Sequence, residues 1–323
     1  MKFIDITNNI KKDLDVFEDM LREIAVGSEP DVSEKLNYIF KNKGKRVRPI
    51  LVYLTNRLFS ESNKSTHNAA LLIELMHNAT LLHDDVVDKA TLRRGKTTVN
   101  SKWDDKTAVL IGDYLFAKSM KIATDNGEYK LFDIITPAIM RLSLGELQQM
   151  DKAKTFDLSL DKYYEVIKNK TASLISTCCK VGAFAGGGEG AEIDILEEFG
   201  EIMGMIFQIK DDILDFNGGS KTGKQKGIDI LENKVTLPVI CAWNNMSESQ
   251  QKELASLWFV ENKSETQINF IIDQVVDNDG IKGSYQVIAE YKKNALVLLN
   301  NIRDTKAKSA LIELLDYIIE RDK

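Results

Sequence analysis

The sequence predicts an all-α protein. Apolar residues recur at helical spacing, as in the opening segment, where steps of four and three separate Ile10, Leu14, Phe17, Leu21 and Ile24. The 323 residues include only four prolines, which favours long helices because proline disrupts a helix interior. No stretch shows the sustained alternation of apolar and polar residues that a β-strand requires.

The helical period locates the expected elements in order. Helices are expected at 34–41, 48–60, 65–88, 104–125, 128–149, 161–184, 191–216, 235–245, 248–258, 264–275, 281–302 and 306–320. Pro30, Pro49 and Pro137 stand where helices could begin. Loops are expected at 89–103, 150–160 and 217–233. No low-complexity linker divides the chain, so we predict one helical domain over 1–323.

Charge and cysteine content exclude several classes of protein. A net charge of −6 argues against a nucleic-acid partner, because such proteins carry a basic face. Cys178, Cys179 and Cys241 form no metal-binding spacing and no disulfide framework, and they fit a reducing, cytoplasmic location. The N-terminus lacks the apolar segment of a signal peptide. No apolar run reaches the roughly 18 residues that a membrane-spanning helix needs.

Two helices are expected to end in the same acidic pattern, Asp-Asp-x-x-Asp, within HDDVVD (83–88) and KDDILD (210–215). Residues four apart share a helix face, so Asp84 and Asp88 project together. In the second copy the shared face includes Gln208, Asp211, Asp212 and Asp215.

Like charges at this spacing destabilise an isolated helix by a few tenths of a kcal/mol per pair, so a bound cation would offset the repulsion. Carboxylates without His or Cys suit a hard ion, and Mg²⁺ is usually shared between one or two carboxylates and substrate phosphates. The alternative is that each cluster is simply a solvated helix end. A calcium-binding EF-hand is excluded because its loop spacing is missing.

Basic residues lie near the first acidic motif. Lys45, Arg46 and Arg48 precede Pro49, and together with the backbone amides of a helix start they could bind an anion. Arg93 and Arg94 follow Asp88 closely. These arginines could instead form a surface salt-bridge network, but a magnesium-bound diphosphate accounts for both signs of charge.

Two further features have both a binding and a structural interpretation. His77 lies two turns before Asp84, although a lone histidine on an apolar helix is usually a core residue. The segment GGSKTGKQKG (218–227) resembles a nucleotide-binding P-loop, but Gln225 stands where that motif needs Ser or Thr. A loop that brings Lys221, Lys224 and Lys226 over a phosphate is the better interpretation.

These residues together resemble the trans-isoprenyl diphosphate synthases, and within that family the long-chain, octaprenyl-type polyprenyl synthases. The resemblance runs from GKRVRP (44–49) to ERDK (320–323). Its most specific parts are LLHDDVVDKATLRRGKTTVN (81–100) and FQIKDDILDF (207–216). Shorter matches are GDYLFA (112–117), GELQQM (145–150), KTASL (170–174) and GKQKGIDILENKVTLP (223–238). A Lys-Gly pair at 43–44 replaces the two glycines common in the family.

The resemblance implies a helical bundle of the isoprenoid synthase type around a central active-site cavity, and it assigns roles to residues. The diphosphate of isopentenyl diphosphate would be held by Lys45, Arg48, His77 and Arg94. Mg²⁺ would be ligated by Asp84, Asp88 and Asp211, with Asp85, Asp212 and Asp215 as further ligands or supporting residues. The allylic diphosphate would contact Arg93, Lys170, Thr171, Gln208, Lys224 and Lys234. The expected catalytic set is Asp84, Asp88, Asp211, Lys170 and Lys224.

The resemblance also bears on the product. Small side chains at Ala79 and Thr80, followed by Met76, would leave the path of the growing chain open, whereas short-chain members carry bulky residues there. We therefore expect a polyprenyl diphosphate of about octaprenyl length, built on farnesyl or geranylgeranyl diphosphate for a quinone side chain. A homodimer with transient membrane contact for product release is expected. The alternatives are a shorter-chain synthase, a terpene cyclase or squalene-type synthase, and a non-catalytic subunit of a heteromeric synthase.

Overall fold

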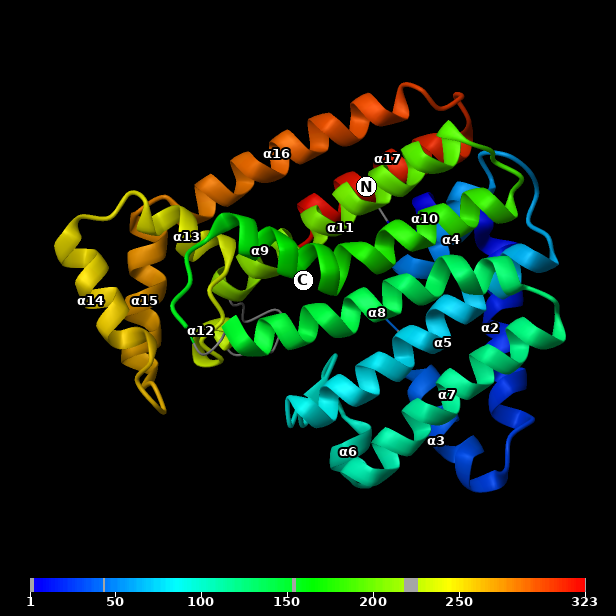
Figure 1. The fold of residues 1–323 in the computed structure, drawn as a ribbon, viewed down its shortest axis with the longest axis horizontal. Coiled ribbons are helices and arrows are strands. Elements are labelled where there is room, and N and C mark those ends of the chain that lie inside the picture. The colour runs from blue at the N-terminus through cyan, green and yellow to red at the C-terminus, as the bar shows by residue number, and fades with distance from the viewer. Residues whose placement is uncertain (1–2, 43, 153–154, 218–225, 323) are drawn as a thin grey trace. The chain divides into compact units, whose positions relative to one another are not determined.

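The computed structural model describes residues 3–42, 44–152, 155–217 and 226–322. The described chain consists almost entirely of helices (Figure 1), which confirms the all-α prediction. Its contacts divide it into two compact units. Unit 1 comprises Met1–Ile139, Thr177–Glu197 and Asn301–Glu313, and unit 2 comprises Met140–Ser176, Glu198–Asn300 and Leu314–Lys323. Four helices continue from one unit into the other: α8 (Tyr129–Lys152), α10 (Ser173–Ala185), α11 (Ala191–Asn217) and α17 (Lys306–Glu320).

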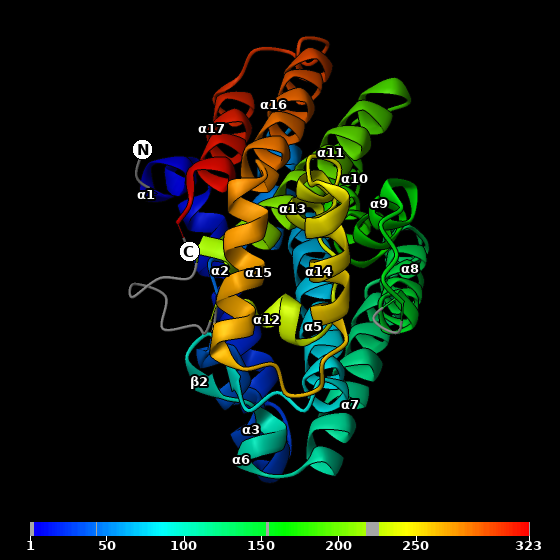
Figure 2. The same cartoon turned by 90° about the vertical axis from the view of Figure 1, so that its left-hand side faces the viewer.

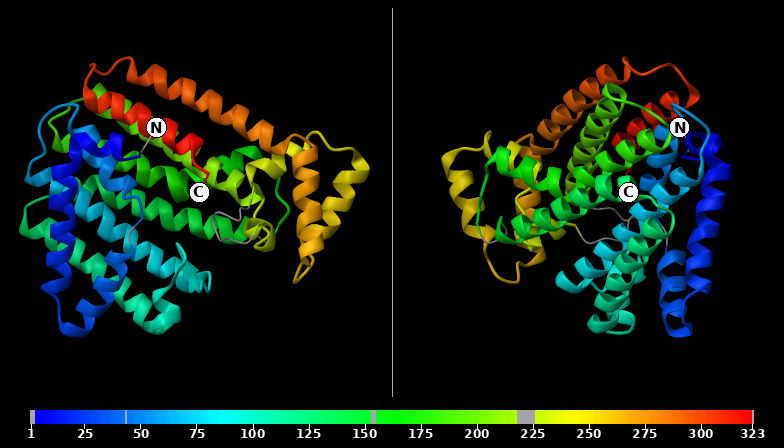
Figure 3. Two further views of the ribbon diagram at one scale, coloured as in Figure 1. Left: turned by 180° about the vertical axis from the view of Figure 1, so that it is seen from behind. Right: turned by 45° about the vertical axis from the view of Figure 1, so that its right-hand side comes forward.

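Unit 1 is organised around α5 (Lys64–Val87). The other elements that lie wholly in unit 1 are α1 (Phe3–Thr7), the 3₁₀ turn η1 (Asn8–Ile10), α2 (Lys11–Val26), α3 (Pro30–Lys41), α4 (Val47–Asn56), β1 (Leu92–Arg93), β2 (Lys96–Thr97), α6 (Val99–Lys102) and α7 (Asp105–Asp125). Helix α5 packs against α2, α4 and α7, and α2 and α3 lie side by side in both views of Figure 3. Because partners cover it on several sides, α5 is buried nearly all round through its middle turns.

Local sequence signals set the position of α5. Asn63 caps the helix by accepting a hydrogen bond from the backbone N–H of Thr66 at 3.0 Å, and the Thr66 hydroxyl accepts one in return from the Asn63 backbone N–H. Near the other end, a Cβ atom at position 112 would collide with the ring of His83. Gly112 therefore allows α7 to lie close against the turn that carries the first acidic motif.

Unit 2 adds a second apolar core. It contains α9 (Leu160–Ile167), the π-helical turn η2 (Lys168–Ala172), α12 (Ile228–Leu231), α13 (Leu237–Trp243), α14 (Glu248–Trp258), α15 (Glu265–Asp277) and α16 (Gly280–Leu299). Capping boxes at Ser247 and Ser264 start α14 and α15, which lie side by side in Figure 2. Trp258 is fully buried in the core cluster that these helices share with α13.

The structure departs from the sequence prediction in several places, among them the short helix α12 within the loop expected at 217–233. The helix expected at 161–184 is interrupted by η2, and the helix expected at 48–60 ends at Asn56. Pro137 lies inside α8 rather than at a helix start. The loop expected at 89–103 contains the hairpin β1–β2 and the short helix α6. Arg94 and Gly95 form the two-residue hairpin turn with φ angles of 54° and 72°, which the right-handed twist of a hairpin favours.

Two expectations from composition can be compared with the structure. All three cysteines are free. Within the described ranges, no helix combines the length and the apolar character needed to cross a membrane. Neither finding fixes a cellular location, so the cytoplasmic expectation stays a prediction.

Candidate functional site

The first acidic motif lies at the C-terminal end of α5, in unit 1. Its three carboxylates differ in exposure: Asp84 is half-buried, Asp85 is buried and Asp88, the residue after the helix end, is exposed. Asp85 accepts a hydrogen bond from Arg93 Nε at 2.7 Å. Burial raises the pKa of Asp85, and the charge of Arg93 opposes that rise. Asp84 and Asp88 are thus more accessible to a ligand than Asp85.

The β1–β2 turn brings Arg94 onto the loop before α4. A Cβ atom at position 44 would lie 2.6 Å from Arg94 Cζ, so a larger residue there would displace the Arg94 guanidinium. Arg94 Nη1 donates to the Asn42 carbonyl at 3.4 Å. The GKRVRP and RRG segments therefore meet at Arg94. Arg48 and Arg93, which belong to these segments, are 45 residues apart in the sequence.

A neutral histidine lies within this basic cluster. His77 is 7% exposed, and burial, followed by the charges of Arg48, Arg94, Arg93 and Arg46, holds its pKa well below the usual value. Within the described part of the chain, His77 Nδ1 has no hydrogen-bond partner. A buried polar atom surrounded by guanidinium groups is suited to an anionic ligand, since an anion would satisfy the ring and balance the charge.

Arg46 does not belong to this anion-binding group, contrary to the expectation from the sequence. Its side chain donates to Glu18 at 3.0 Å and also pairs with Glu74. The arginine is the left-handed residue, with φ of 56°, that precedes α4. It therefore anchors the start of α4. Lys45, in the preceding loop, is exposed, and Arg48, in the first turn of α4, is half-buried.

Unit 1 contains a pocket beneath the hairpin. Helix α3, the end of α5 and the β1–β2 segment form its walls, which are lined by Tyr38, Ile39, Asn42, Asn78, Leu81, Leu82, Asp85, Arg93, Arg94, Thr97, Thr98 and Val99. The Tyr38 hydroxyl donates to the Thr97 carbonyl at 2.6 Å and ties the hairpin to α3.

The second acidic motif lies near the end of α11, in unit 2. The Asp211 side chain is 43% exposed and accepts from Arg321 Nη2 at 2.6 Å. Arg321 also donates to the Phe207 carbonyl and lies 4.1 Å from the centre of the Phe207 ring. Sequence reasoning gave Arg321 no role, although it lies in the ERDK segment that the resemblance includes.

The other two carboxylates of this motif are held by the protein. Asp212 is 3% exposed; its Oδ2 accepts from the Tyr163 hydroxyl at 2.6 Å and its Oδ1 from Gln208 Nε2 at 2.9 Å. Burial raises the pKa of Asp212 to about 7. Asp215 accepts from the backbone N–H groups of Ile228 and Asp229, both at 3.1 Å, and so fixes the first turn of α12.

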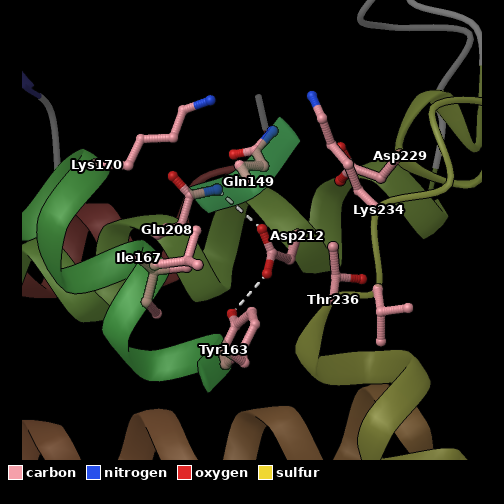
Figure 4. Close-up of a pocket in the computed structure, with 11 residues that line it drawn as sticks. Gln149, Tyr163, Ile167, Lys170, Gln208, Asp212, Asp229, Lys234 and Thr236 are labelled. Carbon is pink, nitrogen blue, oxygen red and sulfur yellow. Dashed lines mark hydrogen bonds between the residues drawn. The ribbon is translucent and has the colours of Figure 1, made fainter. Parts of the chain in front are cut away.

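A polar pocket opens above Asp212 in unit 2 (Figure 4). It is lined by Gln149, Tyr163, Val166, Ile167, Lys170, Gln208, Asp212, Asp229, Lys234, Val235 and Thr236. In Figure 4 the amino groups of Lys170 and Lys234 point to the same side of this pocket. Of the residues expected at the allylic diphosphate, Lys170, Gln208 and Lys234 therefore line one cavity.

The π-helical turn η2 places Lys170 and Thr171. A Cβ atom at position 145 would lie 2.6 Å from Lys170 N, so Gly145 lets α8 approach this turn. Lys170 Nζ pairs with Glu146 at 2.8 Å, and Thr171 Oγ1 donates to Gln208 Oε1 at 2.7 Å. A π-helical turn has no clear signal in sequence periodicity, and such turns are frequent at functional sites.

Sequence reasoning missed several residues of this pocket. Tyr163, Gln149 and Asp229 line it, and Glu146 pairs with Lys170. Burial, followed by the charges of Asp212 and Asp215, raises the pKa of Asp229 well above its usual range. Gln149, Glu146 and Asp229 lie within GELQQM and GKQKGIDILENKVTLP, so the resemblance offered a signal for them. Lys224 lies outside the described residues.

Comparison with known proteins places the chain in a family. The model of the family described as "Polyprenyl synthetase" matches residues 29–275. This chain belongs to the polyprenyl synthetase family. It is 34% identical over 322 residues to "Heptaprenyl diphosphate synthase component 2" of Bacillus subtilis, covering 99% of this chain and 91% of that protein. Relatives at 30% identity include a geranylgeranyl diphosphate synthase of Sulfolobus acidocaldarius, matched over 332 residues that cover 99% of this chain and 98% of that one.

Solved structures agree with this assignment. A decaprenyl diphosphate synthase from Rhodobacter capsulatus matches with a TM-score of 0.91 and 31% identity over 100% of both chains. A polyprenyl synthase from Caulobacter crescentus, complexed with calcium and isoprenyl diphosphate, matches with a TM-score of 0.91 and 27% identity over 100% of this chain and 98% of that one. The isoprenoid synthase fold and the expected enzyme class are confirmed, and family membership decides against the terpene cyclase alternative.

The carboxylates of this polyprenyl synthetase fit a divalent metal. Across the described ranges, no three His, Cys, Asp or Glu side chains gather into a ready-made metal site. Asp84 and Asp88 are instead one turn apart, with Asp84 half-buried and Asp88 exposed, and the Asp211 side chain of the second motif is 43% exposed. One or two carboxylates with substrate phosphate oxygens is the arrangement that Mg²⁺ favours, so these residues suit an ion that arrives with a diphosphate.

The residues expected to control chain length lie deep in unit 1. Ala79 is fully buried, Met76 is 3% exposed and Thr80 is 6% exposed. Thr80 Oγ1 donates to the His77 carbonyl at 2.9 Å, so the hydroxyl is directed back along α5. These three residues line neither of the two pockets described above, and their role stays a prediction.

Proposed function

We propose that this enzyme adds isopentenyl diphosphate units in trans to an allylic diphosphate, with Mg²⁺, and makes a polyprenyl diphosphate of about octaprenyl length. The observation that supports the proposal is that each acidic motif adjoins its own set of side chains whose charge and hydrogen-bonding groups suit a phosphate. Unit 1 provides Arg48, His77 and Arg94, and unit 2 provides Lys170 and Lys234. A condensation of two diphosphates needs two such sets.

Isopentenyl diphosphate is assigned to unit 1. Arg48, Arg94 and the exposed Lys45 would bind its diphosphate, and the buried neutral His77 would donate a hydrogen bond to it. Arginine suits this role because its planar guanidinium binds phosphate oxygens with two parallel hydrogen bonds. Isopentenyl diphosphate keeps its diphosphate in the reaction. Its site therefore has to bind this diphosphate without promoting cleavage of the carbon–oxygen bond that holds it.

The allylic diphosphate is assigned to unit 2. Lys170, Lys224 and Lys234 would stabilise the negative charge that grows on the departing diphosphate as the allylic carbon–oxygen bond breaks, with Thr171 and Gln208 as further contacts. Bound Mg²⁺, held by Asp84, Asp88 and Asp211, would supply additional positive charge at the diphosphate oxygens. The double bond of isopentenyl diphosphate then attacks the allylic carbocation, and the departing diphosphate takes the proton that is lost.

The product length rests on Ala79, Thr80 and Met76. The similar proteins named above include heptaprenyl, decaprenyl and geranylgeranyl synthases, so the small side chains at Ala79 and Thr80 are what favour a long product. The decisive experiment is mass analysis of the product made from farnesyl diphosphate, isopentenyl diphosphate and Mg²⁺. A wild type that stops at farnesyl or geranylgeranyl diphosphate would refute the long-chain proposal.

A matched pair of variants tests the path of the growing chain. Ala79→Tyr places a ring along α5 and should shorten the product to farnesyl or geranylgeranyl diphosphate, while Ala79→Ser, which keeps a small side chain, should retain the long product. Both profiles are compared by chromatography at identical substrate ratios. An unchanged long product from a folded Ala79→Tyr protein would show that the chain takes another route.

We further propose that the enzyme acts as a homodimer, and an apolar stripe on α8 supports this. Met140, Leu144, Leu147 and Met150 follow helical spacing and are 69%, 48%, 62% and 51% exposed. A second copy of the chain would cover them. Light scattering of the wild type and of Leu147→Glu tests this: we expect a dimer that the charge weakens. A monomeric wild type that binds lipid vesicles through the stripe would favour membrane contact instead.

One observation favours a second candidate. The Bacillus relative is named as component 2 of its synthase, so this chain could be the catalytic component of a two-component enzyme. Full synthesis by the isolated chain would exclude that candidate, and a chain that binds both substrates but turns over only with a partner would support it. The family match at 29–275 runs through both units, which supports one polyprenyl synthase domain.

A further inference from the structure

Three hydrogen bonds connect four residues beneath the pocket of unit 2. Thr171 Oγ1 donates to Gln208 Oε1 at 2.7 Å, Gln208 Nε2 donates to Asp212 Oδ1 at 2.9 Å, and the Tyr163 hydroxyl donates to Asp212 Oδ2 at 2.6 Å. Figure 4 shows the two bonds that converge on Asp212. We call these four residues the Asp212 relay. It joins α9, η2 and α11.

The carboxylate sets the direction of the relay. Both Asp212 oxygens accept, one from the Tyr163 hydroxyl and one from Gln208 Nε2, whereas an amide has one donating and one accepting end. Asp212 therefore turns the amino end of the Gln208 amide toward itself, and the carbonyl end of the same amide then faces Thr171. The Thr171 hydroxyl in turn donates its hydrogen bond to Gln208 Oε1. The second N–H of Gln208 Nε2 is left to donate on the pocket side, where Gln208 forms part of the lining.

Burial separates Asp212 from its neighbour. Asp212 and Tyr163 are each 3% exposed, while the Asp211 side chain is 43% exposed. Both oxygens of Asp212 already accept from buried donors, and removing either donor would leave a buried charge poorly satisfied. Asp211 has the accessible face that a metal ion shared with a diphosphate would need.

We propose that Asp212 and Tyr163 are positioning residues, which hold Gln208 in the orientation that receives the allylic diphosphate, and that Asp212 is not a direct metal ligand. This inference rests on the proposed function. It gives Tyr163 a role through its hydroxyl group, which donates to Asp212, rather than through its aromatic ring. The sequence pattern treats Asp211 and Asp212 alike. The relay distinguishes them.

Tyr163→Phe tests the relay by removing one hydroxyl. The expected result is a rise of about tenfold in KM for the allylic diphosphate, equivalent to about 1.4 kcal/mol, with KM for isopentenyl diphosphate and the Mg²⁺ activation constant unchanged. Tyr164→Phe is the matched control, because Tyr164 is the next residue and contacts the rings of Tyr163 and Tyr291 rather than Asp212. Equal behaviour of the two variants would overturn the proposal.

Asp212→Asn separates a relay from a ligand. Asparagine can keep both bonds, since its oxygen can accept from Gln208 and its amino group can donate to the Tyr163 oxygen. A relay residue then retains Mg²⁺ binding, which is measured without turnover by calorimetric titration of Mg²⁺ in the presence of inorganic diphosphate. Asp211→Asn, the reference, should weaken that binding at least tenfold. Equal weakening in Asp212→Asn would make Asp212 a ligand and overturn the proposal.

The outcomes also separate this inference from the proposed function. A wild type that consumes no isopentenyl diphosphate would refute the proposed function. If the wild type is active but Tyr163→Phe keeps the wild-type KM for the allylic diphosphate, only the role of the Asp212 relay would be refuted. Denaturant unfolding of each variant checks the fold. If Tyr163→Phe is unfolded, the calorimetric comparison of Asp212→Asn with Asp211→Asn still decides.

Discussion

The two acidic motifs share one sequence pattern but have different surroundings. In both, the middle aspartate is the buried one: Asp85 in unit 1 and Asp212 in unit 2. Asp85 faces the guanidinium of Arg93, whereas Asp212 faces the neutral groups of Tyr163 and Gln208. Burial raises the pKa of both carboxyls, but only the first has a positive charge opposing that rise at hydrogen-bond distance.

The difference extends to the outer aspartates. Asp88 is exposed beyond the end of α5, while Asp215, its counterpart, is bound to two backbone N–H groups at the start of α12. Asp84 is half-buried, while Asp211 carries the ion pair with Arg321. Equal spacing therefore gives equal placement on a helix, and the surrounding elements decide how deeply each carboxylate is buried and which groups it contacts.

The largest expected effect comes from the first aspartate of each motif. Asp84→Ala and Asp211→Ala should each lower turnover by several orders of magnitude, because each lost charge contact is worth ~3–4 kcal/mol at the transition state. The measurement is steady-state turnover with farnesyl diphosphate, isopentenyl diphosphate and Mg²⁺. Asp273→Ala, an exposed change on α15, is the control, and near-normal turnover in either motif variant would refute the assignment.

The same pair should differ in stability without Mg²⁺. Asp84→Ala relieves repulsion within the motif, so its free energy of unfolding should equal or exceed that of the wild type. Asp211→Ala removes the partner of Arg321, so no gain is expected there. Denaturant unfolding of both proteins measures the difference.

The next largest effect should separate the two diphosphate sites. Arg94→Ala should raise KM mainly for isopentenyl diphosphate, and Lys170→Ala mainly for the allylic substrate, each by ~10-fold or more because hydrogen bonds to charged groups are worth ~1.5–3 kcal/mol. Lys224→Ala should also act on the allylic step. Steady-state titration of each substrate measures the constants, and an effect of Arg94→Ala on the allylic KM alone would mean that the sites are reversed.

The pH dependence of stability should have opposite signs in the two units. The pKa of His77 is lowered by burial and the nearby arginines, so its contribution is present above about pH 6.5, the unfolded value, and is lost as the pH falls. The pKa of Asp212 is raised to about 7, so its contribution is present at acid pH and is lost as the pH rises through that value. Each slope approaches about 1.4 kcal/mol per pH unit.

Metal-free unfolding of two variants tests these signs. The two slopes oppose each other between pH 5 and about pH 6.5, so the wild type should change little there. His77→Gln should leave only the Asp212 slope, and its stability should fall as the pH rises toward 7. Asp212→Asn should leave only the His77 slope, and its stability should fall toward pH 5. The free energy of unfolding is measured by denaturant titration across this range. Wild-type slopes in both variants would contradict the two protonation states.

The smallest effect concerns the third aspartate of each motif. Asp215→Ala leaves the first N–H groups of α12 without their acceptor and should cost about 1–2 kcal/mol of unfolding free energy, as loss of a helix cap does. Asp88→Ala removes a negative charge at a helix C-terminus and should be neutral or slightly stabilising. Equal losses in denaturant unfolding would show that the two positions are equivalent after all.

Helical periodicity by itself determined most of the secondary structure. It located α5, α7, α14 and α17 to within about two residues, because apolar residues three and four apart can be buried together only on a helix. The spacing of the acidic motifs likewise determined that Asp84 and Asp88 lie one turn apart. The resemblance then supplied the basic residues that accompany them.

Tertiary structure alone decided how those residues are used. The sequence cannot show that Arg46 forms ion pairs with Glu18 and Glu74, or that Lys170 lies in a π-helical turn. It also cannot show that Tyr163 donates a hydrogen bond to Asp212, which is 49 residues away. Each of these depends on a contact between distant segments, whose free energy is realised only once the helices pack. Helical periodicity predicts which face of a helix is buried. The residues that contact this face are determined by the tertiary packing of the other helices.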